Sequence, residues 1–275
     1  NLEEWFAGEA NAFPIGQKIF TWGVPVLDAY FSPLKQGKFV ILAGESGAGK
    51  TTFSFFMALQ NAILGKKVCY LSLEMDVKEM ARVYLRNRLG ITKDTARRES
   101  YSAQDQMSAR ELIKAASKNL RLGRYQEHDT NLENIQQIIV EEQPDLLFID
   151  NLGFIDGEGE EWEKTAIISR GLTKLAHEKN VTIIALHHFK KGGKNIDDMR
   201  GSGKIKDDTD FVLKISRFPK DNDEIILTPE EKATTYVSIG KDREFGELGT
   251  CKLFYQQGQF NTDYRNQTRT EDIPF

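Results

Sequence analysis

The run Gly44-Glu45-Ser46-Gly47-Ala48-Gly49-Lys50-Thr51 has the spacing of a phosphate-binding loop. It follows an apolar run, Lys38–Ala43, and opens a segment with helical periodicity. Glycines let the backbone aim several N–H groups at one anion, and the helix that begins near Lys50 adds the positive end of its dipole. The feature predicts a strand–loop–helix unit that binds a nucleoside triphosphate, ATP or another, with Lys50 on the β- and γ-phosphates and Thr51 on Mg²⁺. Thr52 extends the predicted phosphate-binding set, and a glycine-rich turn without a ligand is the alternative.

Length and composition favour one α/β domain with extensions, because the 275 residues contain no Pro-, Gly- or Ser-rich linker. The chain begins at Asn1 rather than Met, so we expect a further N-terminal region. No apolar run reaches the roughly 20 residues of a membrane span, and no leader resembles a signal peptide. We therefore expect no membrane partner and a cytoplasmic location. Cys69 and Cys251 lie in apolar strand-like runs and are predicted to be small buried side chains rather than a disulfide or metal ligands.

Acidic residues outnumber basic ones, 41 to 37, for a formal net charge of −4. Affinity for nucleic acid comes largely from cations that meet phosphates, so this balance argues against a surface that coats nucleic acid and leaves only a local contact. One cation-rich segment lies between Phe189 and Asp207. Its cations are Lys190, Lys191, Lys194, Arg200, Lys204 and Lys206. By itself the segment fits a nucleic-acid contact and a solvated charged loop equally well.

Apolar runs alternate with segments of helical spacing along most of the chain. Strands are predicted over Phe39–Ala43, Val68–Leu73, Leu146–Asp150, Thr182–His187 and Phe211–Ile215, and helices over Thr52–Leu64, Val77–Leu89, Ala109–Leu120, Leu132–Glu142 and Lys164–Lys179. This alternation is typical of a mainly parallel central sheet flanked by helices, the α/β class. Short runs at Tyr236–Gly240, Thr250–Tyr255 and near Phe260 predict a C-terminal antiparallel extension.

Two of the predicted strands lead into carboxylates. Asp150 ends Leu146–Asp150, where a carboxylate reaches the edge of the sheet beside a P-loop Mg²⁺, and a turn former or helix cap is the alternative. Glu74 follows Val68–Leu73, where it could orient and deprotonate an attacking water as a general base. A carboxylate that stabilises the start of the next helix is an equal alternative for Glu74.

Further segments occur in an order that resembles the DnaB family of replicative DNA helicases. They are Ser72-Leu73-Glu74-Met75, Ile168-Ser169-Arg170-Gly171-Leu172 with Leu175-Ala176, Met199-Arg200-Gly201-Ser202-Gly203 with Asp208 and Asp210, Lys241-Asp242-Arg243, and Gly249-Thr250. The resemblance runs from about Thr21 to Tyr255. It implies a RecA-like P-loop NTPase fold and an ATP-dependent helicase motor domain over 21–262, between an N-terminal linker over 1–20 and a tail over 263–275. It also implies a homo-oligomer, a hexameric ring, that moves on single-stranded DNA.

The resemblance implies that residues on two subunits share one ATP site. Glu74 would be the catalytic glutamate, and Arg243 would act in trans as an arginine finger on ATP bound to the next subunit, assisted by Lys241. A cation inserted from a neighbour stabilises the negative charge that spreads over the transferred phosphoryl group. Without the resemblance, Lys241 and Arg243 alternate along a strand and are more typical of surface cations.

The resemblance also implies roles around the phosphates, the base and the DNA. His188 would sense the γ-phosphate, with a capped strand end or a metal pair with His187 as alternatives; neighbouring strand residues point to opposite faces, which disfavours the pair. Arg217 and Tyr255 would stack on the nucleobase. The implied DNA contacts are Lys190, Lys191, Arg200, Gly201, Ser202, Gly203 and Lys204, which would line the pore and follow the backbone of single-stranded DNA without reading its bases.

Three other interpretations stay open. One is a recombinase or clock-type (KaiC-like) RecA relative that works by filament or switch assembly, and another is a nucleotide-binding scaffold that hydrolyses little. A plasmid-type, RepA-like helicase is the third, because the paired histidines point towards phage, plasmid or organellar relatives; the location would then include an organellar matrix or the cytoplasm of a phage-infected cell. A primase or a loader is a further possible partner.

Overall fold

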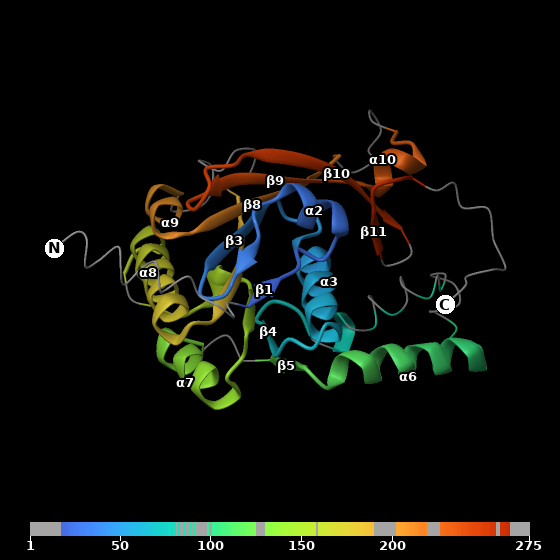
Figure 1. Ribbon diagram of the computed structural model, residues 1–275, viewed down its shortest axis with the longest axis horizontal. Helices are drawn as coiled ribbons and strands as arrows, with labels where there is room; N and C mark the ends of the chain where they lie inside the picture. Colours follow the sequence, from blue (N-terminus) through green and yellow to red (C-terminus); the bar gives the residue numbers. More distant parts are fainter. Residues whose placement is uncertain are drawn as a thin grey trace, which may run out of the picture.

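The computed structural model describes residues 18–76, 78–80, 82, 85, 89, 91, 98, 101–124, 130–157, 159–189, 202–218, 226–256 and 259–264. Its main sheet has nine strands: β3 (Phe39–Gly44), β4 (Val68–Ser72), β5 (Leu120–Arg124), β6 (Leu146–Asp150), β7 (Thr182–His188), β8 (Phe211–Arg217), β9 (Thr234–Asp242), β10 (Gly249–Gln256) and β11 (Gln259–Asn261). Their order across the sheet is β11-β10-β9-β8-β3-β7-β6-β4-β5. Figure 1 shows part of this order, from β10 and β9 at the top of the view to β4 and β5 below.

The strands from β8 to β5 run parallel, and the last three along the chain are antiparallel. Pairing of β3 with β7 and β8, of β6 with β7 and β4, and of β4 with β5 is parallel in every case. Strands β9, β10 and β11 then add antiparallel neighbours at the β8 side. The fold class expected from the sequence, a mainly parallel sheet with a C-terminal antiparallel extension, is confirmed.

Helices cover both faces of this sheet. The described helices are α2 (Pro25–Tyr30), α3 (Lys50–Ile63), α6 (Ala103–Ser117), α7 (Leu132–Glu142), η1 (Leu152–Phe154), α8 (Glu161–Lys179), α9 (Ser202–Asp208) and α10 (Pro229–Ala233). Side chains alternate along β3, so Val40 and Leu42 join one core with α2 and α3, whereas Phe39 and Ile41 join a second core with α7 and α8. The parallel strands are thus buried on both faces, as their continuous apolar runs predict.

Local signals explain where several helices begin. Ser102 and Asp105 form a capping box at the start of α6, Asn131 caps α7, and Thr228 and Glu231 form a second capping box before α10. These short polar side chains accept hydrogen bonds from N–H groups that have no partner within the helix.

The prediction was wrong around the third helix. We expected one helix over Ala109–Leu120, whereas α6 ends at Ser117 and Leu120 begins strand β5. Leu120 pairs with Val68 at the edge of the sheet, a contact that no local pattern encodes. The helix expected over Val77–Leu89 falls largely outside the described residues, and none of the described helices is long and apolar enough to cross a bilayer.

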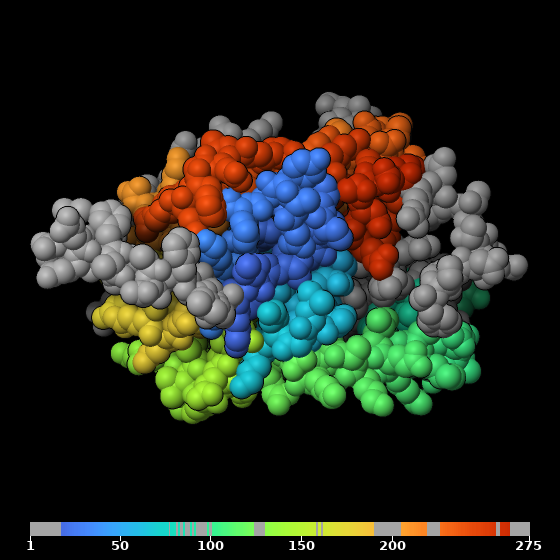
Figure 2. All heavy atoms as spheres, viewed as in Figure 1, coloured from blue at the N-terminus to red at the C-terminus, as the bar shows by residue number. Residues whose placement is uncertain are grey.

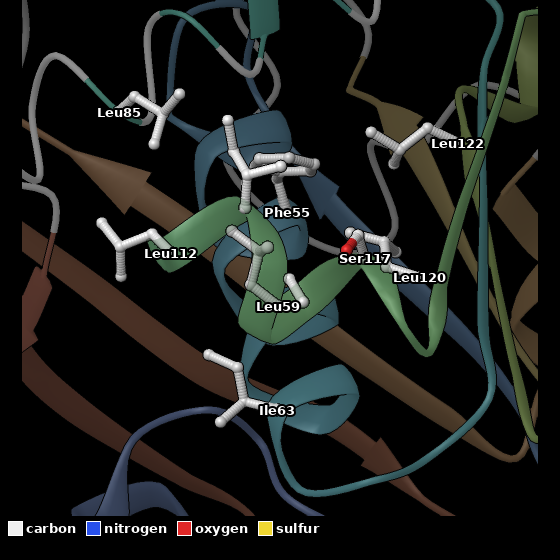
Figure 3. A pocket seen from close by; sticks show the side chains of 10 residues that line it. Phe55, Leu59, Ile63, Leu85, Leu112, Ser117, Leu120 and Leu122 are labelled. Carbon is white, nitrogen blue, oxygen red and sulfur yellow. The ribbon is translucent and has the colours of Figure 1, made fainter. Parts of the chain in front are cut away.

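Two features flank the sheet. Helix α2 connects β1 (Ile19–Phe20) to β2 (Leu34–Lys35), which pair as a small antiparallel sheet, and Figure 2 shows this segment between the C-terminal strands and α3. Between α3, α6 and β5 lies an apolar pocket of about 210 Å³ (Figure 3). Its lining residues are Phe55, Leu59, Ile63, Leu85, Leu112, Ile113, Ala116, Ser117, Leu120 and Leu122. None of them belongs to the predicted phosphate-binding loop.

Candidate nucleotide-binding and catalytic site

The predicted site residues meet where four parallel strands end. Strands β3, β4, β6 and β7 are neighbours in register, and their carboxyl ends lie along one edge of the sheet. This edge carries Gly44 after β3, Glu74 two residues beyond β4, Asp150 at the end of β6 and His188 at the end of β7. Ligands of open α/β sheets bind at this edge.

The loop from Gly44 to Lys50 turns the chain from β3 into α3. Gly47 and Gly49 have φ angles of 79° and 93°, a left-handed conformation that side chains with a Cβ rarely adopt. A Cβ on Gly44 would lie 2.5 Å from the carbonyl oxygen of Ile215 on β8. Gly47 and Gly49 are therefore needed for the turn, and Gly44 is needed for close packing against β8. The loop ends at the N-terminus of α3, where backbone N–H groups favour an anion.

Lys50 is folded back over this loop. Its Nζ donates to the carbonyl oxygens of Gly44 and Glu45, at 2.9 and 2.8 Å, and to Nδ1 of His188 at 3.0 Å. Burial lowers the pKa of Lys50 to about 8, although the nearby carboxylates Asp150, Glu74 and Glu45 oppose this shift. The hydrogen-bond acceptors of Lys50 named above are uncharged, so a phosphate, which is an anion, would be a stronger partner for this buried cation.

Asp150 is almost fully buried, and one of its oxygens has no partner. Oδ2 accepts a hydrogen bond from the Tyr70 hydroxyl at 3.1 Å, whereas Oδ1 has no hydrogen-bond partner. Burial raises the pKa of Asp150 to about 6, although the nearby Thr51 and Tyr70 hydroxyls oppose this shift. An orphaned carboxylate oxygen beside the Thr51 hydroxyl fits Mg²⁺, because this ion prefers hard oxygen ligands.

Glu74 is held by a residue that directly follows Asp150. The Asn151 amide Nδ2 donates to Glu74 Oε2 at 2.7 Å, and the Asn151 Oδ1 accepts from the Gly153 N–H at 2.9 Å, which fixes the orientation of the amide. The backbone N–H of Glu74 also donates to the Asp150 carbonyl, at 3.2 Å. The Asp150–Asn151 peptide is cis. The side chain of Glu74 is 43% exposed, so water has access to its carboxylate.

His188 lies between Lys50 and Glu74. Because the Lys50 ammonium only donates, Nδ1 of His188 accepts and the ring proton is on Nε2. Nε2 lies 3.5 Å from Glu74 Oε2 and 3.1 Å from Asn151 Nδ2, and with this tautomer the Asn151 contact is not a hydrogen bond. A role for His188 as a sensor of the γ-phosphate stays a prediction.

Arg217 and Tyr255 lie on the antiparallel side of the loop. A Cβ on Gly49 would be 3.8 Å from Cδ of Arg217, so this side chain passes beside the P-loop. Burial lowers the pKa of Arg217, and the neighbouring Tyr255 opposes the shift. The Tyr255 ring packs at 4.7 Å from the Phe260 ring. The two residues expected at the base are thus brought together, and base stacking stays a prediction.

Lys241 and Arg243 lie at the opposite edge of the sheet. Strand β9 runs antiparallel to β8, so Thr235 is beside Arg217, whereas Lys241 is beside Val212. The Arg243 N–H donates to the Asp210 carbonyl, and the Asp210 N–H donates to the carbonyl of Phe39 at the start of β3. The two cations are therefore level with the amino ends of the parallel strands, away from the P-loop of their own chain.

These cations bind the end of a short helix in their own chain. Lys241 Nζ donates to the carbonyls of Lys206 and Asp207, and Arg243 donates to the carbonyl of Asp207, at the C-terminus of α9. Burial, together with the charge of Arg243, lowers the pKa of Lys241. Asp242, between them, accepts the N–H groups of Glu244 and Phe245 and so forms the turn that ends β9.

The predicted DNA contacts are only partly described. Lys190, Lys191, Arg200 and Gly201 lie outside the described residues, and Ser202, Gly203 and Lys204 are described only as backbone of α9. The described part therefore leaves these contacts as predictions. The segment does connect the end of β7, with His188, to α9, whose C-terminus holds Lys241 and Arg243.

Sequence reasoning missed two residues of the site. Asn151 links Glu74 with the 3-10 turn η1, and Tyr70 binds Asp150 from within β4. A polar Asn directly after a strand-end carboxylate, and a Tyr in an otherwise apolar strand, were the signals available. Neither signal identifies its partner, which comes from a different strand.

A P-loop and a strand-end carboxylate on a mainly parallel sheet define a P-loop NTPase of the RecA-like class. The fold comparison agrees. A solved structure described as an ATPase domain aligns with a TM-score of 0.77 and 21% identity, over 94% of this chain and 98% of that one. A second, described as a DnaB-like replicative helicase and its interactions with primase, aligns with a TM-score of 0.74 and 22% identity, over 87% of this chain and 61% of that one.

The family can be stated from the sequence match. The family described as "DnaB-like helicase C terminal domain" matches residues 20–263, and the chain belongs to it. A relative named "Probable plasmid replicative DNA helicase", from Chlamydia trachomatis serovar L2, is 28% identical over an alignment of 251 residues that covers 85% of this chain and 51% of the relative. The chain thus spans about half the length of that relative.

Proposed function

We propose that this chain, over residues 21–262, is the ATP-hydrolysing motor domain of a ring-forming replicative DNA helicase. ATP binds at the P-loop, and its hydrolysis at subunit borders drives movement along single-stranded DNA. Family membership supports the assignment, since the family match covers most of the chain. The name of the Chlamydia relative favours a plasmid-type branch of the same function.

One observation carries the proposal: the two halves of the expected catalytic set lie at opposite edges of one sheet. Lys50, Glu74, Asp150 and His188 are at the carboxyl edge. Arg243 is level with Phe39, at the start of β3, and the strand from Phe39 to Gly44 is about 16 Å long at about 3.3 Å per residue. A cation there cannot serve its own P-loop, whereas it can reach a nucleotide held by a neighbouring copy.

The chemistry divides among the residues of the carboxyl edge. Lys50 neutralises the β- and γ-phosphates, and the loop N–H groups orient them for in-line attack. Glu74 accepts a proton from the attacking water, with its carboxylate oriented by Asn151. Thr51 and Asp150 would hold Mg²⁺, which supplies positive charge to the phosphate oxygens. His188 gains or loses its Lys50 contact as the γ-phosphate binds or leaves.

The remaining roles complete the motor. Arg217 and Tyr255 stack on the nucleobase, and Arg243 and Lys241 stabilise the transition state on the neighbour. The segment from Lys190 to Lys204 follows the phosphates of single-stranded DNA inside a hexameric ring, which multiplies weak contacts along one strand. We place a primase or a loader among its partners, and we assign it to the compartment where DNA is copied, the cytoplasm for a bacterial, plasmid or phage protein.

The test is ATP turnover and unwinding of a forked DNA by the wild-type chain and by Glu74→Gln. Loss of the general base is expected to lower turnover by about 10² to 10⁴. Binding of ATP should change little, because Gln keeps the shape of the side chain. Glu111→Gln, on the exposed face of α6, is the matched control and should behave as wild type.

Equal turnover for wild type and Glu74→Gln would remove Glu74 from catalysis. Wild-type protein without DNA-stimulated turnover would overturn the motor assignment and leave a nucleotide-binding scaffold. Electron microscopy with ATP and single-stranded DNA provides a separate check, since open helical filaments without unwinding would favour a recombinase-like or clock-type assembly instead of a ring.

A further inference from the structure

A single buried hydroxyl lies between the two elements that carry the expected magnesium ligands. Tyr70 on β4 is fully buried. Its ring stacks on Phe148 of β6 and meets Phe55 of α3 edge to face. The hydroxyl is 3.1 Å from Asp150 Oδ2 and 2.8 Å from Ser54 Oγ. Tyr70 therefore contacts the strand of Asp150 and the helix of Thr51 at once.

The direction of these hydrogen bonds follows from the proton count. A carboxylate only accepts, so the one Tyr70 proton is donated to Asp150, and the Tyr70 oxygen accepts from Ser54. Hydrogen bonds to an ionised acceptor are about twice as strong as neutral ones, which favours this arrangement. Ser54 also lies 3.1 Å from the Thr51 carbonyl, but that carbonyl has a helical N–H partner four residues on, whereas the Tyr70 oxygen has no other described donor. Two consecutive hydrogen bonds thus form a chain, in which Ser54 donates to Tyr70 and Tyr70 donates to Asp150.

This row of hydrogen bonds fixes one oxygen of Asp150. The terminal torsion of an aspartate is broad and nearly two-fold, so its carboxylate takes its orientation from the polar groups around it, here the Tyr70 and Thr51 hydroxyls. Tyr70 holds Oδ2, and Oδ1 is left buried without a hydrogen-bond partner. Ser54 lies three residues after Thr51, on the same side of α3. The Tyr70 hydroxyl therefore links the position of Asp150 to the helix that carries Thr51, the other expected Mg²⁺ ligand.

We propose that Tyr70 is a positioning residue for the magnesium site, whose hydroxyl holds Asp150 against α3 and presents Oδ1 to Mg²⁺ or to a water bound to it. The inference deepens the proposed function and rests on it. Nothing in the spacing of the P-loop or of the strand-end carboxylate requires this Tyr. Tyr70→Phe is the direct test, because it removes one oxygen and keeps the ring against Phe148 and Phe55.

We expect Tyr70→Phe to weaken only those steps that depend on Mg²⁺. Loss of a group that orients a metal ligand typically lowers metal affinity or activity by about 10- to 100-fold. We expect Tyr70→Phe to weaken ADP binding about tenfold in Mg²⁺, as measured by titration calorimetry, and to leave ADP binding in EDTA unchanged. The Mg²⁺ concentration for half-maximal ATP turnover should rise about tenfold, and turnover should recover at high Mg²⁺.

Two further variants make the result specific. Ser54→Ala removes the donor to Tyr70 and should shift the Mg²⁺ dependence in the same direction by a smaller factor. Tyr236→Phe, on β9 and remote from Asp150, is the matched control and should leave the Mg²⁺ dependence unchanged. If Tyr70→Phe does not fold, Ser54→Ala still decides, because its effect depends on the same chain.

The outcomes separate the inference from the proposed function. A wild-type protein that binds ADP with Mg²⁺ and turns over ATP, beside a Tyr70→Phe protein with the same Mg²⁺ dependence, overturns the inference alone. An equal loss of ADP binding with and without Mg²⁺ also overturns it, since that pattern shows a structural role. A wild-type protein that binds no ADP in Mg²⁺ overturns both.

Discussion

The two edges of the sheet differ in how their charged groups are satisfied. At the carboxyl edge, Lys50 and Asp150 are buried, and burial moves the pKa of both towards neutrality. At the amino edge, Arg243 is exposed and Lys241 is half-buried. The charged groups of the first edge are thus desolvated, whereas the cations of the second edge donate to carbonyls of their own chain and remain accessible. Under the proposed function, one protomer holds the nucleotide at its carboxyl edge and a second copy completes the charge around it.

The amino edge also connects the cations to a second element. Lys241 and Arg243 donate to carbonyls at the C-terminus of α9, where the helix dipole favours positive charge. Helix α9 contains the last residues of the basic segment that is predicted to contact DNA. Movement of the cations towards a phosphate on a neighbour would break these bonds, so the nucleotide state and the helix would change together.

The largest expected effect falls on the amino edge. Arg243→Ala should lower ATP turnover by about 10³, equal to about 4 kcal/mol in the barrier, because the transition-state charge loses its cation. Nucleotide binding should persist, since the carboxyl edge is intact. Mixing Arg243→Ala with Lys50→Ala protein should restore part of the activity, because some borders then combine an intact P-loop with an intact Arg243. Steady-state turnover at several mixing ratios measures this.

The control for that experiment is Lys252→Ala, which removes a cation of the same antiparallel extension that pairs with Glu230. It should keep wild-type turnover, because an exposed ion pair contributes little. Absence of recovery at every ratio, with mixed oligomers verified by native mass spectrometry, would show that Arg243 does not act across the border. The difference between the two edges would then reflect packing within one chain and not an ATP site shared by two subunits.

The second-largest expected effect is on the pH dependence of stability, which tests the buried carboxylate at the carboxyl edge. The pKa of Asp150 is raised from 3.8 to about 6 by burial. The neutral carboxyl is therefore favoured in the folded state, and its contribution to stability is full below pH 4 and is lost as pH rises through 6. The shift corresponds to about 3 kcal/mol, at about 1.4 kcal/mol per pKa unit.

Asp150→Asn removes this titration. In protein free of Mg²⁺ and nucleotide, the unfolding free energy of the variant should fall less than that of wild type between pH 4 and pH 7, by about 2 kcal/mol. Guanidinium unfolding at a series of pH values measures the difference, and Asp105→Asn at the exposed cap of α6 is the control. Parallel pH curves for wild type and Asp150→Asn would disprove the buried-charge account.

The smallest expected effect concerns how closely Gly44 packs against β8. Gly44→Ala puts a Cβ 2.5 Å from the backbone oxygen of Ile215, which cannot move without shifting β8. We expect a loss of about 1 to 3 kcal/mol in stability, the usual cost of overpacking. Gly249→Ala is the matched control at the other edge, since a Cβ there meets nothing within 4 Å. Equal thermal unfolding of the two variants would show that the carboxyl edge tolerates expansion.

The sequence predicted the parts of the fold that are local. Strand β6 and helix α7 were predicted with the bounds that the structure has, because a continuous apolar run and a 3.6-residue period are both short-range patterns. Strand β5 was missed because it lies at the edge of the sheet and its residues, Leu120–Arg124, follow a helix without a Gly or Pro break. The catalytic and DNA-binding roles of the site residues stay predictions.

Contacts between distant strands were not predictable in the same way. Asn151 reaches Glu74 across 77 positions, Tyr70 reaches Asp150 across 80, and Lys50 reaches His188 across 138. Each contact depends on which strands are neighbours, and that order is set by packing of the whole sheet. A candidate list of residues could therefore be compiled from motifs, whereas their hydrogen-bond partners could not.

The amino-acid sequence by itself determined the strand–loop–helix unit around Lys50, the alternation of strands and helices, and the carboxylates that follow the strands, because each is a pattern over a few neighbouring residues. The tertiary structure decided that Glu74, Asp150 and His188 meet Lys50 at one edge, that Lys241 and Arg243 lie at the other, and that Tyr70 and Asn151 hold the two carboxylates. The physical reason is that side-chain periodicity is a property of the local chain, whereas the pairing order of strands depends on how the complete set of apolar faces is buried.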